Sequence, residues 1–108
     1  MEHEFLIVLI TTPSMEVSEK IASHLVEQKL AACVNITAPV RSIYRWQGKI
    51  EREEEFFLIC KTRRDLFDPD FLTAVKSLHP YTVPEIIALP IELGSASYLD
   101  WIRAETRA

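Results

Sequence analysis

The sequence predicts an α+β sandwich in which helices cover one face of a mainly antiparallel sheet. Three observations predict it. Short apolar runs typical of strands alternate with segments whose apolar residues have helical spacing. A turn sequence near the middle of the chain joins two strand-like runs. The length of 108 residues supports one hydrophobic core and not two, so we expect a single domain over residues 1–108.

The first half of the chain predicts two strands around a helix. Phe5–Ile10 is a continuous apolar run, which is typical of a central strand covered on both faces. Ser14 is a suitable N-cap for a helix that continues to about Lys29. The inward face of this helix is predicted to consist of Ile21, Ala22, Leu25 and Val26. We expect the second strand at Leu30–Ile36.

The second half begins with a long hairpin whose turn is Gln47–Gly48. The expected elements are a strand over Val40–Trp46, its return over Lys49–Lys61, a helix that starts at Asp68–Pro69 and stops at His79–Pro80, a strand over Val83–Leu89, and an extra C-terminal helix after Gly94–Ser95. This order gives two strand–helix–strand units around a hairpin, so the predicted fold is ferredoxin-like.

Several of these strands are apolar on both sides, although the helices can cover only one face of the sheet. Either the extra C-terminal helix or another subunit must cover the second face. The hairpin carries Tyr44 and Trp46 and offers an edge for pairing. We infer an oligomer from this pattern.

Composition excludes several classes of function. The formal net charge of −4 argues against binding to nucleic acid or to an anionic membrane, although residues 41–64 carry seven basic side chains among four glutamates. The two glycines, Gly48 and Gly94, are too far apart for a phosphate-binding glycine loop. The apolar run Phe5–Ile10 is too short to span a membrane or to act as a signal segment. We therefore expect a cytoplasmic protein without membrane or nucleic-acid partners.

The two cysteines, Cys33 and Cys60, lie in apolar runs and form no C-x-x-C pair. Buried free thiols in a reducing compartment are the expected state. Neither cysteine nor any serine lies in a recognisable nucleophile motif, so we do not expect an enzyme.

Four segments of the chain together resemble one known family. They are Ala31–Ile36 (AACVNI), Ser42–Glu51 (SIYRWQGKIE), His79–Ile91 (HPYTVPEIIALPI) and Tyr98–Trp101 (YLDW). In order and spacing they resemble the CutA family of divalent-cation tolerance proteins over essentially the whole chain. The resemblance implies a homotrimer with the architecture of the PII signalling proteins. It also implies a role in tolerance to copper or another divalent cation, with no obligatory cofactor.

The resemblance makes His79 the first metal-ligand candidate, with Cys33 as a second. The family's copper-binding pattern has two adjacent histidines before Pro-Tyr and a cysteine near the end of the first strand. Here Leu78 stands at the first histidine position and Ile10 at the cysteine position. A stable copper or zinc site usually needs three or four ligands. His79 could instead cap the end of its helix, and Cys33 could simply pack.

A cleft for a small polar or anionic ligand is the alternative site. Lys61 and Glu85 are charged residues within apolar strands, and they could form an ion pair or line a cleft between subunits. The aromatic residues Tyr44, Trp46 and Tyr81 would form the walls of such a cleft. The acidic residues Glu51, Glu53 and Glu55 share one face of their strand, either as a solvated edge or as an attraction for cations.

Overall fold

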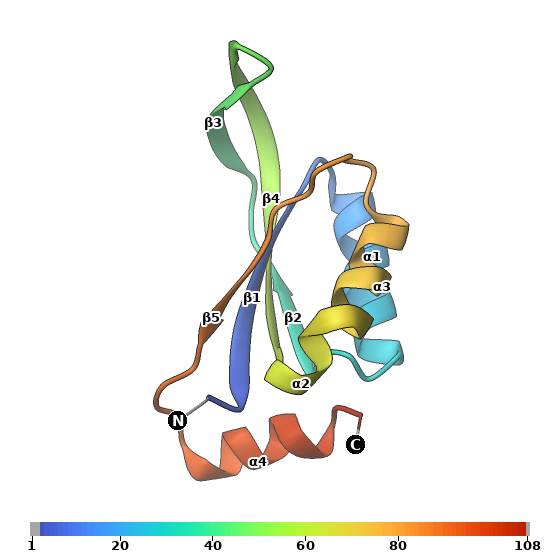
Figure 1. Cartoon of the computed structure of the whole chain (residues 1–108), viewed down its shortest axis with the longest axis vertical. Helices are drawn as coiled ribbons and strands as arrows, with labels where there is room; N and C mark the ends of the chain where they lie inside the picture. The colour runs from blue at the N-terminus through green and yellow to red at the C-terminus, as the bar shows by residue number, and fades with distance from the viewer. Residues whose placement is uncertain (1–2, 108) are drawn as a thin grey trace.

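The computed structural model describes residues 3–107 as an α+β domain with an antiparallel sheet, as the sequence predicts (Figure 1). The elements are β1 (Phe5–Thr12), α1 (Met15–Glu27), β2 (Cys33–Ile36), β3 (Val40–Trp46), β4 (Lys49–Arg63), α2 (Arg64–Leu66), a distorted helical turn (Phe67–Phe71), α3 (Leu72–Leu78), β5 (Ile86–Pro90) and α4 (Ala96–Ala104). The strands follow the order β2-β4-β1-β5, and β3 pairs with the outer half of β4. The two-stranded arm formed by β3 and β4 therefore projects beyond the sheet.

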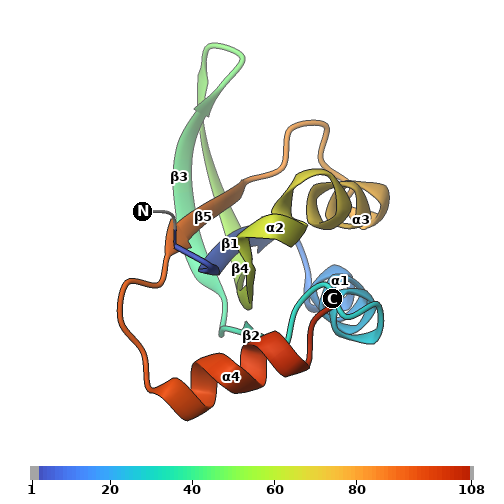
Figure 2. The same cartoon turned by 60° about the horizontal axis from the view of Figure 1, so that its bottom comes forward.

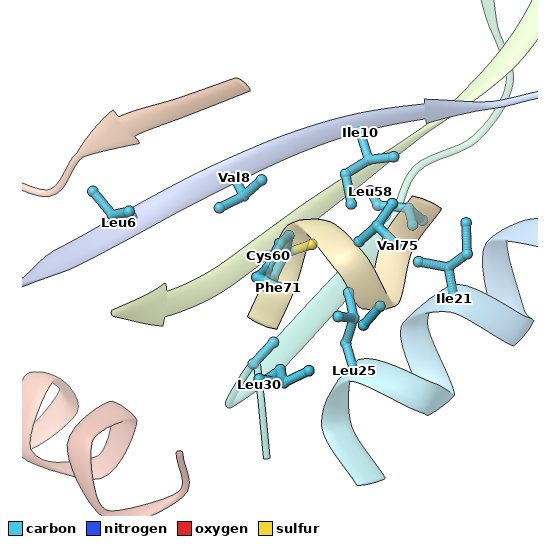
Figure 3. Close-up of a cluster of buried hydrophobic side chains, with 12 residues drawn as sticks. Leu6, Val8, Ile10, Ile21, Leu25, Leu30, Leu58, Cys60, Phe71 and Val75 are labelled. Carbon is cyan, nitrogen blue, oxygen red and sulfur yellow. The ribbon is translucent and has the colours of Figure 1, made fainter. Parts of the chain in front are cut away.

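The hydrophobic core lies between the sheet and the helices α1 and α3 (Figure 3). From β1, Leu6, Val8 and Ile10 point into it and are at most 4% exposed. Leu58 and Cys60 of β4 continue the same layer, and the helices contribute Ile21, Leu25, Phe71 and Val75. The helix α1 begins as predicted, because the Ser14 side chain accepts a hydrogen bond from the Val17 N–H at 3.2 Å.

The C-terminal end of α1 differs from the prediction for a local reason. Lys29 has a positive φ of 57°, which ends the helix, and the N–H groups of Leu30 and Ala31 donate to the Leu25 carbonyl. Leu30 and Ala31 are buried but belong to this helix end, so β2 starts at Cys33 and not at Leu30. The apolar run thus combines a helix end with a strand.

Two further boundaries shift in the second half. Helical structure begins at Arg64, and Asp68 interrupts it with an extended backbone (φ −130°, ψ 118°) before the main turns of α3. β5 begins at Ile86 and not at Val83. Pro84 has no N–H to donate to a neighbouring strand, and the Val83 side chain is 66% exposed.

β1 is central in the sheet, as predicted, but it is covered on one face only. Its register places Leu9 opposite Ile59 and Ile87, and Ile7 opposite Leu89. We call these five residues the open face, because they lie on the side of the sheet away from α1 and α3. Ile87 and Leu89 remain 52% and 53% exposed.

The C-terminal helix α4 lies across the end of the sheet (Figure 2). It buries Ile102 completely and connects through Arg103, whose guanidinium makes two 2.9 Å bonds to the Glu4 carboxylate. The sequence suggested that either this C-terminal helix or another subunit covers the second face of the sheet. The helix α4 leaves much of the open face exposed, so it does not provide that cover.

Candidate ligand-binding groove

A groove of about 660 Å³ lies between the β3–β4 arm and residues 80–85. The arm forms because Gln47 and Gly48 both adopt positive φ angles, 50° and 81°, which suit a two-residue hairpin turn. This turn aligns β3 with β4 and brings Tyr44 and Trp46 to one wall of the groove. Residues 80–85 form the facing wall with Tyr81 and Glu85.

Four of the five residues predicted for a cleft therefore line one groove, and Lys61 does not. Lys61 lies six residues beyond Glu55 along β4, about 20 Å at the usual rise of a strand. It stands opposite Ile7 and Cys33, and its ammonium group donates to the Asn35 side-chain oxygen. Within residues 3–107 it forms no ion pair with Glu85, which lies on the opposite wall of the groove just before β5.

Glu55 is the groove residue that the sequence reasoning missed. It belongs to the acidic stretch predicted to be either a solvated edge or an attraction for cations, and it is only 5% exposed, so Glu55 is not part of a solvated edge. The Tyr81 hydroxyl donates to its Oε2 at 3.0 Å. Burial, together with this bond to a carboxylate, raises the pKa of the Tyr81 phenol well above its usual value.

Negative charge dominates the electrostatics of the groove. The Tyr44 hydroxyl donates to the Glu53 carboxylate, and this hydrogen bond raises the pKa of Tyr44 to about 12. Partial burial, and then the neighbouring Glu55 carboxylate, raise the pKa of Glu85. All three raised pKa values have neighbouring carboxylates among their causes, so the surroundings of the groove disfavour a further negative charge.

His79 does not line the groove, but it is hydrogen-bonded to Tyr81, which does. It is 8% exposed; its Nε2 donates to the Thr11 carbonyl at 2.7 Å, and its Nδ1 accepts the Tyr81 N–H at 3.1 Å. Together these bonds assign the Nε2–H tautomer and connect the end of α3 to β1. Metal coordination by His79 would require one of these hydrogen bonds to break, since both ring nitrogens are in use.

The two cysteines have different surroundings. Cys33 is half-buried at the start of β2, and its Sγ lies 3.9 Å from Asn35 Oδ1. Cys60 is fully buried, and burial raises its pKa to about 12, so its thiol stays protonated. Among residues 3–107, no three His, Cys, Asp or Glu side chains gather closely enough to hold a metal ion.

The part of the chain that the structure describes contains no helix long and apolar enough to cross a membrane. Its one-sided sheet, projecting arm and acidic aromatic groove define a small α+β domain without a preformed metal centre in the described residues.

Comparison with known families identifies the group to which this domain belongs. The family model described as CutA1 divalent ion tolerance protein matches residues 6–105. The chain belongs to this family. The family description names no reaction.

Individual relatives agree with this assignment. The divalent-cation tolerance protein CutA of Thermus thermophilus is 55% identical over 100 residues, which cover 93% of this chain and 96% of the relative. A solved structure of the Thermus thermophilus divalent cation tolerance protein has a TM-score of 0.92 at 53% identity, and covers 95% of this chain and 99% of that one. The chloroplastic CutA protein of Arabidopsis thaliana is 45% identical over 102 residues, covering 94% of this chain but 56% of the relative. The chain thus spans little more than half of this plant relative.

Proposed function

We propose that this protein acts in the response to divalent metal ions as a homotrimer that binds a small ligand in the groove. The groove is the observation that carries the proposal. Its volume of about 660 Å³ lies in the range of small-molecule sites, and aromatic side chains and a few polar groups line it. Family membership supports the link to metal ions.

The open face supports the trimeric state. Contiguous apolar residues on a sheet surface mark interaction sites, and Ile87 and Leu89 are each more than half exposed in the single chain. The strand order, with two strand–helix–strand units around the arm, agrees with a ferredoxin-like fold. In this proposal three such domains assemble with their open faces toward the symmetry axis, in the manner of PII proteins.

A thermal-shift screen with small metabolites and divalent metal salts tests the groove. A ligand that binds only the folded protein raises the melting temperature in proportion to the logarithm of its concentration. We expect a stabilising ligand whose effect disappears in Tyr44→Ala. Tyr98→Ala is the matched control, because Tyr98 is 43% exposed on α4 and does not line the groove. A ligand effect that survives Tyr44→Ala would place the binding site elsewhere.

Direct copper binding is the second candidate function, and the half-buried thiol of Cys33 favours it. Cu(I) prefers soft sulfur ligands, and Cys33 is the more accessible of the two cysteines. One thiol is too few for a stable site, so the remaining ligands would come from other subunits or from a rearranged His79.

Titration with Cu(I) under reducing conditions separates these ideas. We expect Cys33→Ser to abolish binding and Cys60→Ser to preserve it, because the Cys60 thiol is fully buried. Equal affinity of the two variants would remove Cys33 from the site, and a loss in His79→Gln alone would assign the metal to His79.

We further propose a cytoplasmic location, a non-enzymatic role and no obligatory cofactor. The two free cysteines agree with a reducing compartment. Fractionation of the native host with an antibody against this chain tests the location.

A further inference from the structure

We propose that the groove binds an organic cation, a protonated amine or guanidinium group carried on an apolar body. This inference rests on the proposed function, because it specifies the chemical class of the ligand. The sequence suggested a polar or anionic ligand when Lys61 was expected in the cleft. With Lys61 on another part of β4, no lysine or arginine remains among the lining residues that the structure describes.

The first argument is an incompletely compensated buried carboxylate. Glu55 is 5% exposed and lines the groove. Among residues 3–107, Tyr81 provides its only side-chain hydrogen bond, at Oε2, and no ion pair reaches it. A carboxylate removed from water is costly unless a positive charge or several donors compensate it. Its other oxygen, Oε1, has no donor among the described residues and is not sealed from solvent, so a cationic N–H group in the groove could reach it and supply both a charge and a hydrogen bond.

The second argument comes from the walls of the groove. Tyr44, Trp46 and Tyr81 line it, and the faces of their rings attract cations. Ile43 and Val83 add apolar surface that suits the body of an organic molecule.

A second carboxylate, that of Glu85, lies on the wall formed by residues 80–85. An anion would meet Glu55 and Glu85 with no basic side chain from the described lining to offset them. An ammonium or guanidinium group would instead have two carboxylates available as acceptors.

An organic cation fits this groove better than a bare metal ion. Ca²⁺ requires six to eight oxygen ligands, and Mg²⁺ near-ideal octahedral geometry. Copper and zinc prefer nitrogen or sulfur. The described lining includes neither histidine nor cysteine, and its volume of about 660 Å³ far exceeds the space that one ion fills. Aromatic walls and two carboxylates are instead the combination that recognises ammonium groups.

Isothermal titration calorimetry of the full chain in its assembled state at pH 8 tests the proposal with matched probes. Phenethylamine carries a positive charge on an aromatic body, phenylacetate carries a negative charge on a similar body, and MgCl₂ and CuCl₂ supply metal ions alone. We expect phenethylamine to bind at one site per chain and phenylacetate to bind about tenfold or more weakly. Neither metal salt should compete for this site.

Glu55→Gln keeps the size of the side chain and removes its charge. We expect it to weaken phenethylamine binding about tenfold or more, whereas Glu54→Gln should change the affinity by less than about twofold. Glu54 is the matched control because it neighbours Glu55 on β4, is exposed and does not line the groove.

Tyr81→Phe separates ligand recognition from a structural role. It retains the ring and removes the one side-chain hydroxyl that donates to Glu55 among the described residues. The Glu55 carboxylate would then accept hydrogen bonds from the ligand without competition from Tyr81. We expect equal or tighter phenethylamine binding in this variant. If Tyr81→Phe and Glu55→Gln weaken binding equally, both substitutions act by disturbing the wall formed by residues 80–85, and the proposal is overturned.

The two levels of the proposal fail differently. Equal or preferential binding of phenylacetate would overturn the organic-cation assignment and leave the groove as a ligand site. Displacement of phenethylamine by a metal salt alone would overturn it in favour of a metal site. If no amine binds the assembled protein, for example because an arginine of a second copy already occupies the groove, the inference is wrong. The proposed function is then decided separately by the thermal-shift screen.

Discussion

If the open face is the subunit interface of the proposed homotrimer, its truncation should dissociate the subunits. In the double variant Ile87→Ala and Leu89→Ala, each substitution removes three carbon atoms from a side chain that is about half exposed in the single chain. At about 0.8 kcal/mol per buried methylene, the exposed half contributes about 1.2 kcal/mol per side chain on assembly. Across both positions in the three chains of the proposed trimer, the loss is about 7 kcal/mol.

This loss converts into a concentration that can be measured. About 7 kcal/mol lowers the association constant of the trimer by about 10⁵. Since three chains combine, the concentration of half-dissociation depends on the square root of that constant and should rise about 300-fold. Size-exclusion chromatography with multi-angle light scattering, over a dilution series, measures the shift directly.

Val26→Ala provides the control for that experiment. Val26 is 44% exposed, but it lies on α1, on the opposite side of the sheet from the open face. It should leave the dilution profile unchanged. Circular dichroism verifies that the double variant stays folded. If the double variant, while folded, dissociates at the same concentration as Val26→Ala and the parent, the open face is not the subunit interface.

Three further variants examine the core, the groove charge and its support. Phe71→Ala should lower the free energy of unfolding by about 3–5 kcal/mol in urea denaturation, because Phe71 is fully buried in the core; a loss below 1 kcal/mol would contradict this packing. The pKa of Glu85 is raised above 4.5, so its ionisation weakens the folded state as pH rises through that pKa. Glu85→Gln should therefore exceed the parent in melting temperature at pH 7, with the difference fading below pH 4.5, and a constant difference across pH would refute this assignment. His79→Ala removes two hydrogen bonds to backbone groups and should cost about 1–3 kcal/mol in urea denaturation, with partial recovery in His79→Gln; equal stability of the two variants would contradict a hydrogen-bonding role.

The order of elements could be predicted from the sequence because each apolar pattern has a local cause. The continuous run Phe5–Ile10 marks the central strand, and Ser14 marks the start of α1. Boundaries were less predictable where a segment serves two purposes. Leu30 and Ala31 are as apolar as a strand, but their N–H groups close the end of α1 on the Leu25 carbonyl. That preference depends on the left-handed backbone of Lys29, which no apolar pattern indicates.

The groove was partly predictable through the arm. A two-residue turn at Gln47–Gly48 fixes the register, which pairs Tyr44 with Glu51, Ser42 with Glu53 and Val40 with Glu55. Residues paired in this way share a face, so the sequence could have placed the acidic alternation beside Tyr44. The burial of Glu55 could not be predicted in the same way.

That burial depends on a contact between distant parts of the chain. His79 donates to the Thr11 carbonyl, 68 residues away, and its other ring nitrogen accepts the Tyr81 N–H. These bonds hold the start of the wall formed by residues 80–85, from which the Tyr81 hydroxyl reaches Glu55. Lys61 was misplaced for a related reason: β4 is 15 residues long, so its two ends serve different surfaces.

The open face and the groove are incomplete in the single chain for the same physical reason. Among the described elements, α1 and α3 cover one side of the sheet, and α4 lies across its end. Ile87 and Leu89 therefore stay exposed, and the projecting arm leaves Glu55 with one neutral partner. In the proposed trimer, assembly covers the open face with apolar surface from the other subunits. A cation in the groove, as proposed above, would compensate Glu55, and the ligand titrations therefore test a different property from the dilution series.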